Sequence, residues 1–191
     1  LIDKYDNGSE LSVKSLDGKH LEAVMISNIV PLDAQTVLEV VYDIDNYDEI
    51  FLSSQQVSTT VLKSTARFTD AYQHLPVPIP FISDRHYIFR MHSINDNRVT
   101  WTLISHNNVY EAFLKERDIE FNKPVYLPSG YGIWDAINNG DKSCRLSYKV
   151  YMDSGGNLPD FLIEWLNKKA LANIFQDVIV EASSRSNQLN H

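Results

Sequence analysis

The segment HLPVPIPFISDRHYIFRMH, residues 74–92, contains the side chain best suited to anchoring a ligand. Arg85 begins a strand-like run in which aromatic residues alternate with polar ones. Successive side chains of a strand point to opposite faces. The face that includes Arg85 is otherwise apolar and carries Tyr87, Phe89 and Met91. A charge at the head of such a face needs a partner or water, so Arg85 is a candidate binding residue.

The segment RFTDAYQH, residues 67–74, supplies an acid that could meet Arg85. The strand face that would carry Asp70 is the more apolar of the two, and it also carries Phe68, Tyr72 and His74. If both strands turn these faces inward, Asp70 and Arg85 pair in one interior. The pair would hold a ligand's hydroxyl or head group, or it would be a buried ion pair that fixes strand register. We predict that Asp70→Asn weakens ligand retention more than it lowers the melting temperature, whereas matched losses would favour the structural role.

Large apolar side chains recur on the neighbouring predicted elements and would form the walls of such an interior. The expected ligand-binding set is Asp70, Tyr72, His74, Arg85, Tyr87, Phe89, Trp101, Leu103, Trp134, Tyr148 and Trp165. For any single wall residue, ordinary core packing is about as good an explanation as ligand contact. The set therefore predicts a lined pocket and not a series of individual contacts.

The elements that must position these residues follow from hydrophobic spacing. Residues 20–30 read as a strand, and residues 31–51 read as a helix that Asp33 caps and that runs down near Asp43–Asn46. Further strands are predicted at 56–64, 66–74, 85–94, 98–106, 125–137 and 144–152. A helix of about 25 residues follows Pro159. One of its apolar stripes is formed by Leu171, Phe175, Val178 and Ala182.

This order of elements predicts an α+β fold with segregated elements, in which residues 1–191 form a single domain. A curved antiparallel sheet crossed by one long helix does not close perfectly over this many aromatic side chains. We therefore expect a mostly apolar cavity between them, of the kind in which small ligands bind.

Composition excludes several classes of protein. The apolar fraction of 43% supports a real core, and the net charge of -8 opposes binding to nucleic acid or adhesion to an anionic membrane. One cysteine, Cys144, allows no internal disulfide, and no apolar run is long enough to predict a transmembrane helix. Because the chain begins with Leu1, we expect a preceding segment, either a signal peptide or other residues, to have been removed, and the compartment stays open.

Three ordered segments resemble the START (StAR-related lipid transfer) branch of the helix-grip superfamily. They are VYDIDNYDEI at 41–50, VPIPFISDRHYIFR at 77–90, and the run from GYGIWDAINNGD to the C-terminal helix at 130–171. The chain departs from the family pattern at Ile50, Phe51, His86 and Ser154. The resemblance implies a curved antiparallel sheet wrapped around the C-terminal helix, with a tunnel for a sterol, phospholipid or similar lipid. It also implies that an acid on the preceding strand, here Asp70, pairs with Arg85.

The same resemblance implies a gate near the tunnel. Residues 107–124 form a long, charged connection in which Phe113 and Leu114 are apolar. We expect these two to cover the tunnel mouth or to touch a membrane briefly during exchange, unless they belong to an ordinary solvated loop.

The leading function is binding and carriage of a hydrophobic ligand, without catalysis. A second possibility is an aromatase or cyclase in which Asp70, Tyr72, His74 and Arg85 position a polyketide-like substrate and move protons. A third is a module that changes partner binding when a ligand fills it. No motif for a metal site, a nucleophile elbow or a phosphate loop is present, so no cofactor or metal is expected.

Overall fold

The computed structural model describes residues 2–15, 22–53, 57–77, 79–105, 109–140, 142–153 and 160–189. The helices are α1 (Ala34–Tyr42), the short 3-10 turn η1 (Ile44–Asn46), α2 (Tyr47–Ile50), α3 (Glu111–Glu120) and α4 (Asp160–Leu189). The strands are β1 (Ile2–Lys4), β2 (Glu10–Ser15), β3 (Glu22–Val30), β4 (Ser58–Ser64), β5 (Thr69–Leu75), β6 (Arg85–Asn95), β7 (Arg98–Leu103), β8 (Val125–Tyr126), β9 (Ser129–Asn138) and β10 (Cys144–Asp153).

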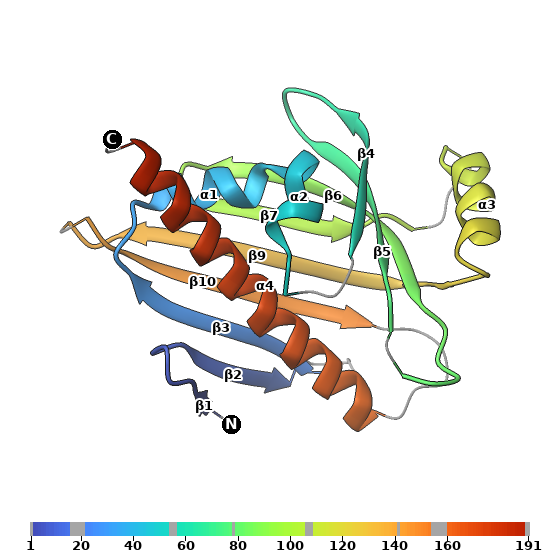
Figure 1. Ribbon diagram of the computed structural model, residues 1–191, viewed down its shortest axis with the longest axis horizontal. Helices are drawn as coiled ribbons and strands as arrows, with labels where there is room; N and C mark the ends of the chain where they lie inside the picture. The colour runs from blue at the N-terminus through green and yellow to red at the C-terminus, as the bar shows by residue number, and fades with distance from the viewer. Residues whose placement is uncertain are drawn as a thin grey trace.

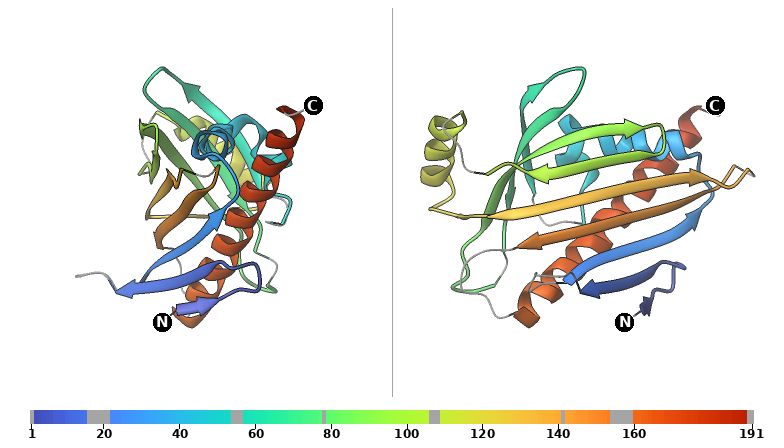
Figure 2. Two further views of the ribbon diagram at one scale, coloured as in Figure 1. Left: turned by 90° about the vertical axis from the view of Figure 1, so that its left-hand side faces the viewer. Right: turned by 180° about the vertical axis from the view of Figure 1, so that it is seen from behind.

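These strands form one ten-stranded sheet with the order β1-β2-β3-β10-β9-β7-β6-β5-β4. All neighbours along this path are antiparallel, and β8 adds a short parallel pairing beside β6. The sheet is curved, and α4 runs diagonally across one of its faces (Figures 1 and 2). The predicted α+β architecture is confirmed.

Helix α4 is held on the sheet by an apolar stripe. Its buried residues recur every three or four positions, the spacing of one helix face, and they are Leu171, Phe175, Val178 and Ala182. This stripe packs in the main core together with the buried face of α1. Opposite the helix, β10 alternates as a half-buried strand should, with Cys144, Leu146 and Tyr148 buried. The predicted stripe is therefore the surface that grips the sheet.

A polar clamp also fixes α4 to the segment after α2. The carboxylate of Asp177, buried on α4, accepts hydrogen bonds from the backbone N–H (3.0 Å) and hydroxyl (2.5 Å) of Ser53. The side-chain amide of Asn173 donates to the Ser53 carbonyl at 3.0 Å. Every polar group of Ser53 is thus engaged by one turn of α4, which ties the helix to the chain that leads into β4.

Helix α1 begins where the sequence predicts. The side chain of Asp33 accepts a hydrogen bond from the backbone N–H of Gln35 at 2.8 Å, which confirms its role as the N-cap. The sequence predicts that the helix over 31–51 runs down near Asp43–Asn46, and the segment does break there, into α1, η1 and α2. The break occurs at Asp43, whose φ and ψ angles of -82° and 60° are not helical.

The expected loop at 107–124 contains α3, and its position differs from that of a gate. Leu114 is buried against Tyr72 and Ile88, in a cluster distinct from the main core. Phe113 packs edge-on against Tyr72, with ring centroids 5.2 Å apart. Because α3 covers β5 and β6 on the face away from α4, Phe113 and Leu114 do not cover the interior. Leu114 is also too buried to touch a membrane in this conformation.

None of the helices in the described residues is both long enough and apolar enough to cross a lipid bilayer.

Candidate functional site

Strands β5 and β6 are covered on both faces, and this decides where the predicted site residues lie. The register pairs Ala71 with Phe89 and Gln73 with Tyr87, and these four side chains share the face that meets α4, the inner face. The other parity faces α3 and is called here the outer face. It carries three of the predicted ligand-binding residues, Asp70, Tyr72 and His74.

The predicted pair of Asp70 with Arg85 is wrong. Asp70 is fully buried on the outer face, where Arg90 binds it through two hydrogen bonds of 2.6 and 2.8 Å. The hydroxyl of Tyr110 donates to the same carboxylate at 2.7 Å, and the Arg90 guanidinium lies 3.8 Å from the Phe68 ring centre. Burial acts to raise the pKa of Asp70, but the hydrogen bonds from Arg90 and Tyr110 outweigh it and hold that pKa below its ordinary value.

The same contact perturbs Tyr110. Its partial burial, together with its hydrogen bond to Asp70, raises the pKa of this phenol to about 12. Tyr110 therefore remains protonated and continues to donate to the carboxylate. Asp70, Arg90 and Tyr110 form a structural network that joins β5, β6 and the start of α3.

His74 and Tyr72 also belong to the outer face. The Nε2 of His74 lies 3.1 Å from the carboxylate of Asp84, and its ring stacks on Phe121 with centroids 3.8 Å apart. Burial lowers the pKa of His74, and the attraction of Asp84 only partly offsets this effect. The Tyr72 hydroxyl lies 3.4 Å from Nδ1 of His86. These groups pack α3 onto the sheet, and the sheet separates them from the interior.

The predicted wall residues do gather on the inner face. Five of them are buried members of the main core, and Leu103 packs against it; the set is Tyr87, Phe89, Trp101, Leu103, Trp134 and Tyr148. Trp134 and Tyr148 stack with centroids 3.9 Å apart, and Phe175 of α4 lies parallel to Trp134 at 6.0 Å. Trp165 lies on α4, but its side chain is outside the described residues. The structure thus brings the aromatic part of the site together and excludes its predicted acid.

Hydrogen bonds organise the few polar groups of the inner face. Tyr87 donates to the side-chain carbonyl of Gln73, whose amide donates to Thr59 at 3.1 Å. Trp101 Nε1 donates to the hydroxyl of Tyr148 at 3.1 Å. Burial raises the pKa of Tyr87 and of Tyr148, so both phenols are neutral. Gln73 was missed as a site residue because its parity looked like the solvent face of an ordinary half-buried strand.

Trp101 is seated over a glycine of the adjacent strand. A Cβ built on Gly132 would lie 2.3 Å from the Nε1 and Cε2 atoms of the Trp101 ring, far inside van der Waals contact. Glycine at this position of β9 is therefore required for the indole to lie flat against the strand and reach Tyr148.

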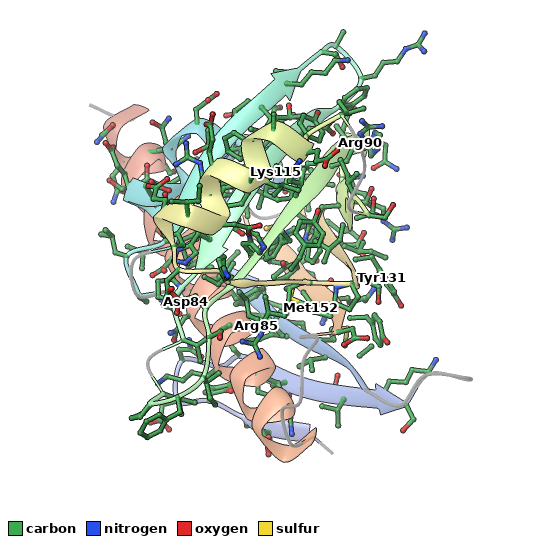
Figure 3. All side chains as sticks on the ribbon, turned by 90° about the vertical axis from the view of Figure 1, so that its right-hand side faces the viewer. Asp84, Arg85, Arg90, Lys115, Tyr131 and Met152 are labelled. Carbon is green, nitrogen blue, oxygen red and sulfur yellow. The ribbon has the colours of Figure 1, made fainter. Side chains whose placement is uncertain are left out.

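Arg85 is the predicted charge that does lie on the inner face. It is 6% exposed, and its guanidinium donates to the carbonyl of Ser83. Burial lowers the pKa of Arg85, with Asp84 acting in the opposite direction. Figure 3 shows Arg85 below α3 and directed toward the N-terminal part of α4, whereas Arg90 lies beside α3. Arg85 therefore places a charge at the end of the inner face nearest the start of α4.

Across the part of the chain that the structure describes, no three His, Cys, Asp or Glu side chains gather closely enough to hold an ion.

Solved structures provide the comparison with known proteins. The chain matches a STAR-related lipid transfer protein fragment from Xanthomonas axonopodis with a TM-score of 0.72 and 15% identity, over 96% of this chain and 98% of that one. It matches human STARD10 with a TM-score of 0.71 and 16% identity, over 100% and 77% of the two chains. The chain has the START-like helix-grip fold.

A third structural neighbour is named as an enzyme. The Zhui aromatase/cyclase from Streptomyces sp. R1128 matches with a TM-score of 0.64 and 14% identity, over 87% of this chain and 96% of that one. The sequence matches no family model and no curated protein. At these identities the structural similarity establishes the helix-grip fold, and the residues of this chain must decide between functions.

Proposed function

We propose that this protein binds a hydrophobic small molecule of the lipid class between the inner face of the sheet and α4, and carries it without chemical change. The observation that carries the proposal is the aromatic inner face gripping α4, with a charge at one end. Burial of apolar ligand surface against such a wall supplies binding energy of about 25 cal/mol per Å². The few hydrogen-bonding groups there would orient the ligand.

The position of Arg85 gives the proposed site a polar end. Arg85 is the first residue of β6. Met91 lies six residues further along the strand and pairs in register with Trp101 of β7. At about 3.3 Å per strand residue, this separation is roughly 20 Å. A ligand with a head group near Arg85 and a hydrocarbon body along Tyr87, Phe89 and Trp101 would fit this distribution of charge and apolar surface.

The names of the structural neighbours are consistent with ligand carriage, but they do not by themselves distinguish carriage from a cyclase function. Two of the compared proteins are named for lipid transfer or for the STARD family, and one is named as an aromatase/cyclase. The enzymatic alternative needs several polar groups around one substrate. In this chain Asp70, Tyr72 and His74 are on the outer face and Arg85 is on the inner face. This division favours carriage over a cyclase mechanism that uses these four residues.

A matched pair of arginine variants tests the proposed site. Delipidated protein would be titrated with fluorescent sterol, phospholipid and fatty-acid analogues, alongside Arg85→Gln and Arg90→Gln. We expect the protein to bind at least one analogue with displacement by its unlabelled parent, and Arg85→Gln to weaken that binding. Arg90→Gln should lower stability and leave affinity unchanged, because Arg90 is on the outer face. No uptake of any analogue, or weaker binding only in Arg90→Gln, would contradict the proposal.

A further inference from the structure

Three tyrosine hydroxyls lie in the interior under α4, and they differ in how their hydrogens are used. Tyr47 donates to the backbone carbonyl of Val41, and Tyr87 donates to the side-chain carbonyl of Gln73. Tyr148 instead accepts, because an indole N–H can only donate and Trp101 Nε1 points at its oxygen from 3.1 Å. Each of these phenols is buried and has a raised pKa, so each keeps its hydrogen.

The hydroxyl hydrogen of Tyr148 therefore has no acceptor among the described residues. Buried polar groups are nearly always paired, because an unpaired buried donor loses its hydrogen bond to water without a replacement. The ring cannot easily turn away to find an acceptor, since it is stacked between strands on Trp134 at 3.9 Å with an interplanar angle of 9°. The protein thus holds one donor in place without using it.

The residues around this donor keep a small exposed fraction. Tyr87, Trp101 and Tyr148 retain 7%, 6% and 6% of their surface, although they are on central strands beneath α4. Their neighbours Phe89 and Trp134 retain 3% each. These three residues are therefore not completely sealed from solvent.

We propose that the O–H of Tyr148 is the donor that recognises a neutral acceptor on the carried ligand, such as a ketone, ester or hydroxyl oxygen. This inference rests on the proposed function and specifies its ligand chemistry. The hydrogen bond from Trp101 polarises the Tyr148 hydroxyl and strengthens the bond that it donates. Trp101 is therefore a positioning residue, which itself depends on the space above Gly132.

A neutral acceptor fits this position better than an anion. Tyr148 stacks on the ring of Trp134 and accepts a hydrogen bond from Trp101. Among the described residues, no cation acts on its pKa. A carboxylate placed there would be buried without a counter-charge, which is far more costly than burying a carbonyl. Arg85, at the other end of the inner face, is the group suited to an acidic head.

Competition binding with matched probes tests this inference. Delipidated protein would first be loaded with an environment-sensitive hydrophobic dye. The dye would then be displaced with methyl undecyl ketone or with tridecane, which have the same number of carbon atoms. We expect the protein to prefer the ketone by about three- to tenfold, the usual range for one buried hydrogen bond. Tyr148→Phe should remove that preference, measured as the ratio of the affinities for the two probes.

Two further variants separate recognition from packing. Tyr72→Phe removes a hydroxyl on the outer face, 3.4 Å from Nδ1 of His86, which the sheet separates from the interior, so its ketone preference should be unchanged. Trp101→Phe should reduce the preference without abolishing it. A Tyr148→Phe protein that still prefers the ketone would overturn the inference and leave the proposed function intact. Failure of the unmodified protein to bind either probe would overturn both.

Discussion

Arg85 and Arg90 are an odd number of residues apart on β6, and their side chains therefore leave opposite faces of the strand. Arg90 ties α3 to the sheet through Asp70, and Arg85 lies on the inner face toward α4. Two residues of the same type in one strand thus have different consequences when they are changed. Changes to the Asp70–Arg90 pair on the outer face are expected to affect stability, and changes to Arg85 on the inner face are expected to affect ligand affinity.

Asp70→Asn tests this division at the residue scale. The substitution removes a buried charge from a two-bond contact with Arg90, while the Tyr110 hydroxyl can still donate to the remaining oxygen. We expect the free energy of unfolding to fall by about 2–3 kcal/mol, since hydrogen bonds to charged groups fall in this range. This corresponds to a drop in melting temperature of roughly 5–10 °C for a chain of this size.

Ligand affinity at a temperature where Asp70→Asn is fully folded should equal that of the unmodified protein. Denaturant unfolding and dye displacement on the same samples give both quantities. This expectation reverses the one drawn from the sequence, which placed Asp70 inside. A loss of affinity larger than the loss of stability would return Asp70 to the ligand site.

At the scale of elements, both faces of β5 are buried. This explains why the sequence analysis assigned the wrong face of this strand to the interior. Six consecutive residues of β5 are buried, because α4 and the main core cover one face and α3 covers the other. In such a strand, polar side chains are satisfied by partners from distant segments, such as Tyr110 for Asp70. Hydrophobic alternation then carries no information about which face is inside.

The attachment of α3 should weaken in acid because of His74. Burial lowers the folded-state pKa of His74 below its ordinary value of 6.5, although Asp84 and Glu120 act to raise it. Below pH 6.5 the unfolded chain therefore binds more protons than the folded chain. The contribution of His74 to stability is fully present above this pH and is lost as pH falls toward the folded-state pKa.

His74→Gln should make stability less dependent on pH in this window. The decrease in slope cannot exceed about 1.4 kcal/mol per pH unit, the limit for one proton. Urea unfolding at a series of pH values gives the slopes, and His92→Gln, whose imidazole contacts the Arg67 carbonyl near the surface, is the control. Equal slopes for the unmodified protein and His74→Gln would refute the assignment.

Gly132→Ala tests whether the glycine of β9 is needed to position Trp101 in the interior. The new methyl would overlap the Trp101 ring at 2.3 Å, so the indole must move away from Tyr148. We expect a loss of stability of about 1–3 kcal/mol from overpacking, together with weaker ligand binding. Gly130→Ala is a milder control, because its nearest contact is the flexible end of Leu103 at 3.1 Å. If both variants lose stability and affinity equally, Trp101 has no special role.

The sequence predicted the elements well and the site in part, for identifiable reasons. Strand and helix positions followed from spacing, and the Asp33 cap and the apolar stripe of α4 follow from local chemistry. The inner aromatic wall was predictable because Trp101 shares a strand face with the apolar Leu103, and Tyr148 shares one with Leu146. The partner of Asp70 was not, since it depends on the register between β5 and β6 and on a helix, α3, with little amphipathic pattern.

At the scale of the whole molecule, the arrangement separates stability from binding. The outer face of β5 and β6 is sealed by α3 through charged and hydrogen-bonded contacts, and the inner face is aromatic with few polar groups. Helix α4, clamped at Ser53 by Asp177, closes the inner face (Figure 1). We therefore expect a ligand to enter between α4 and the sheet and nowhere beneath α3.

Native mass spectrometry of the protein purified gently from cells tests the central claim most directly. The account predicts a population heavier than the chain by the mass of a hydrophobic molecule, which organic solvent extracts and which the emptied protein takes up again. A bare chain mass in every preparation, with no uptake of offered sterols, phospholipids or fatty acids by the emptied protein, would contradict it.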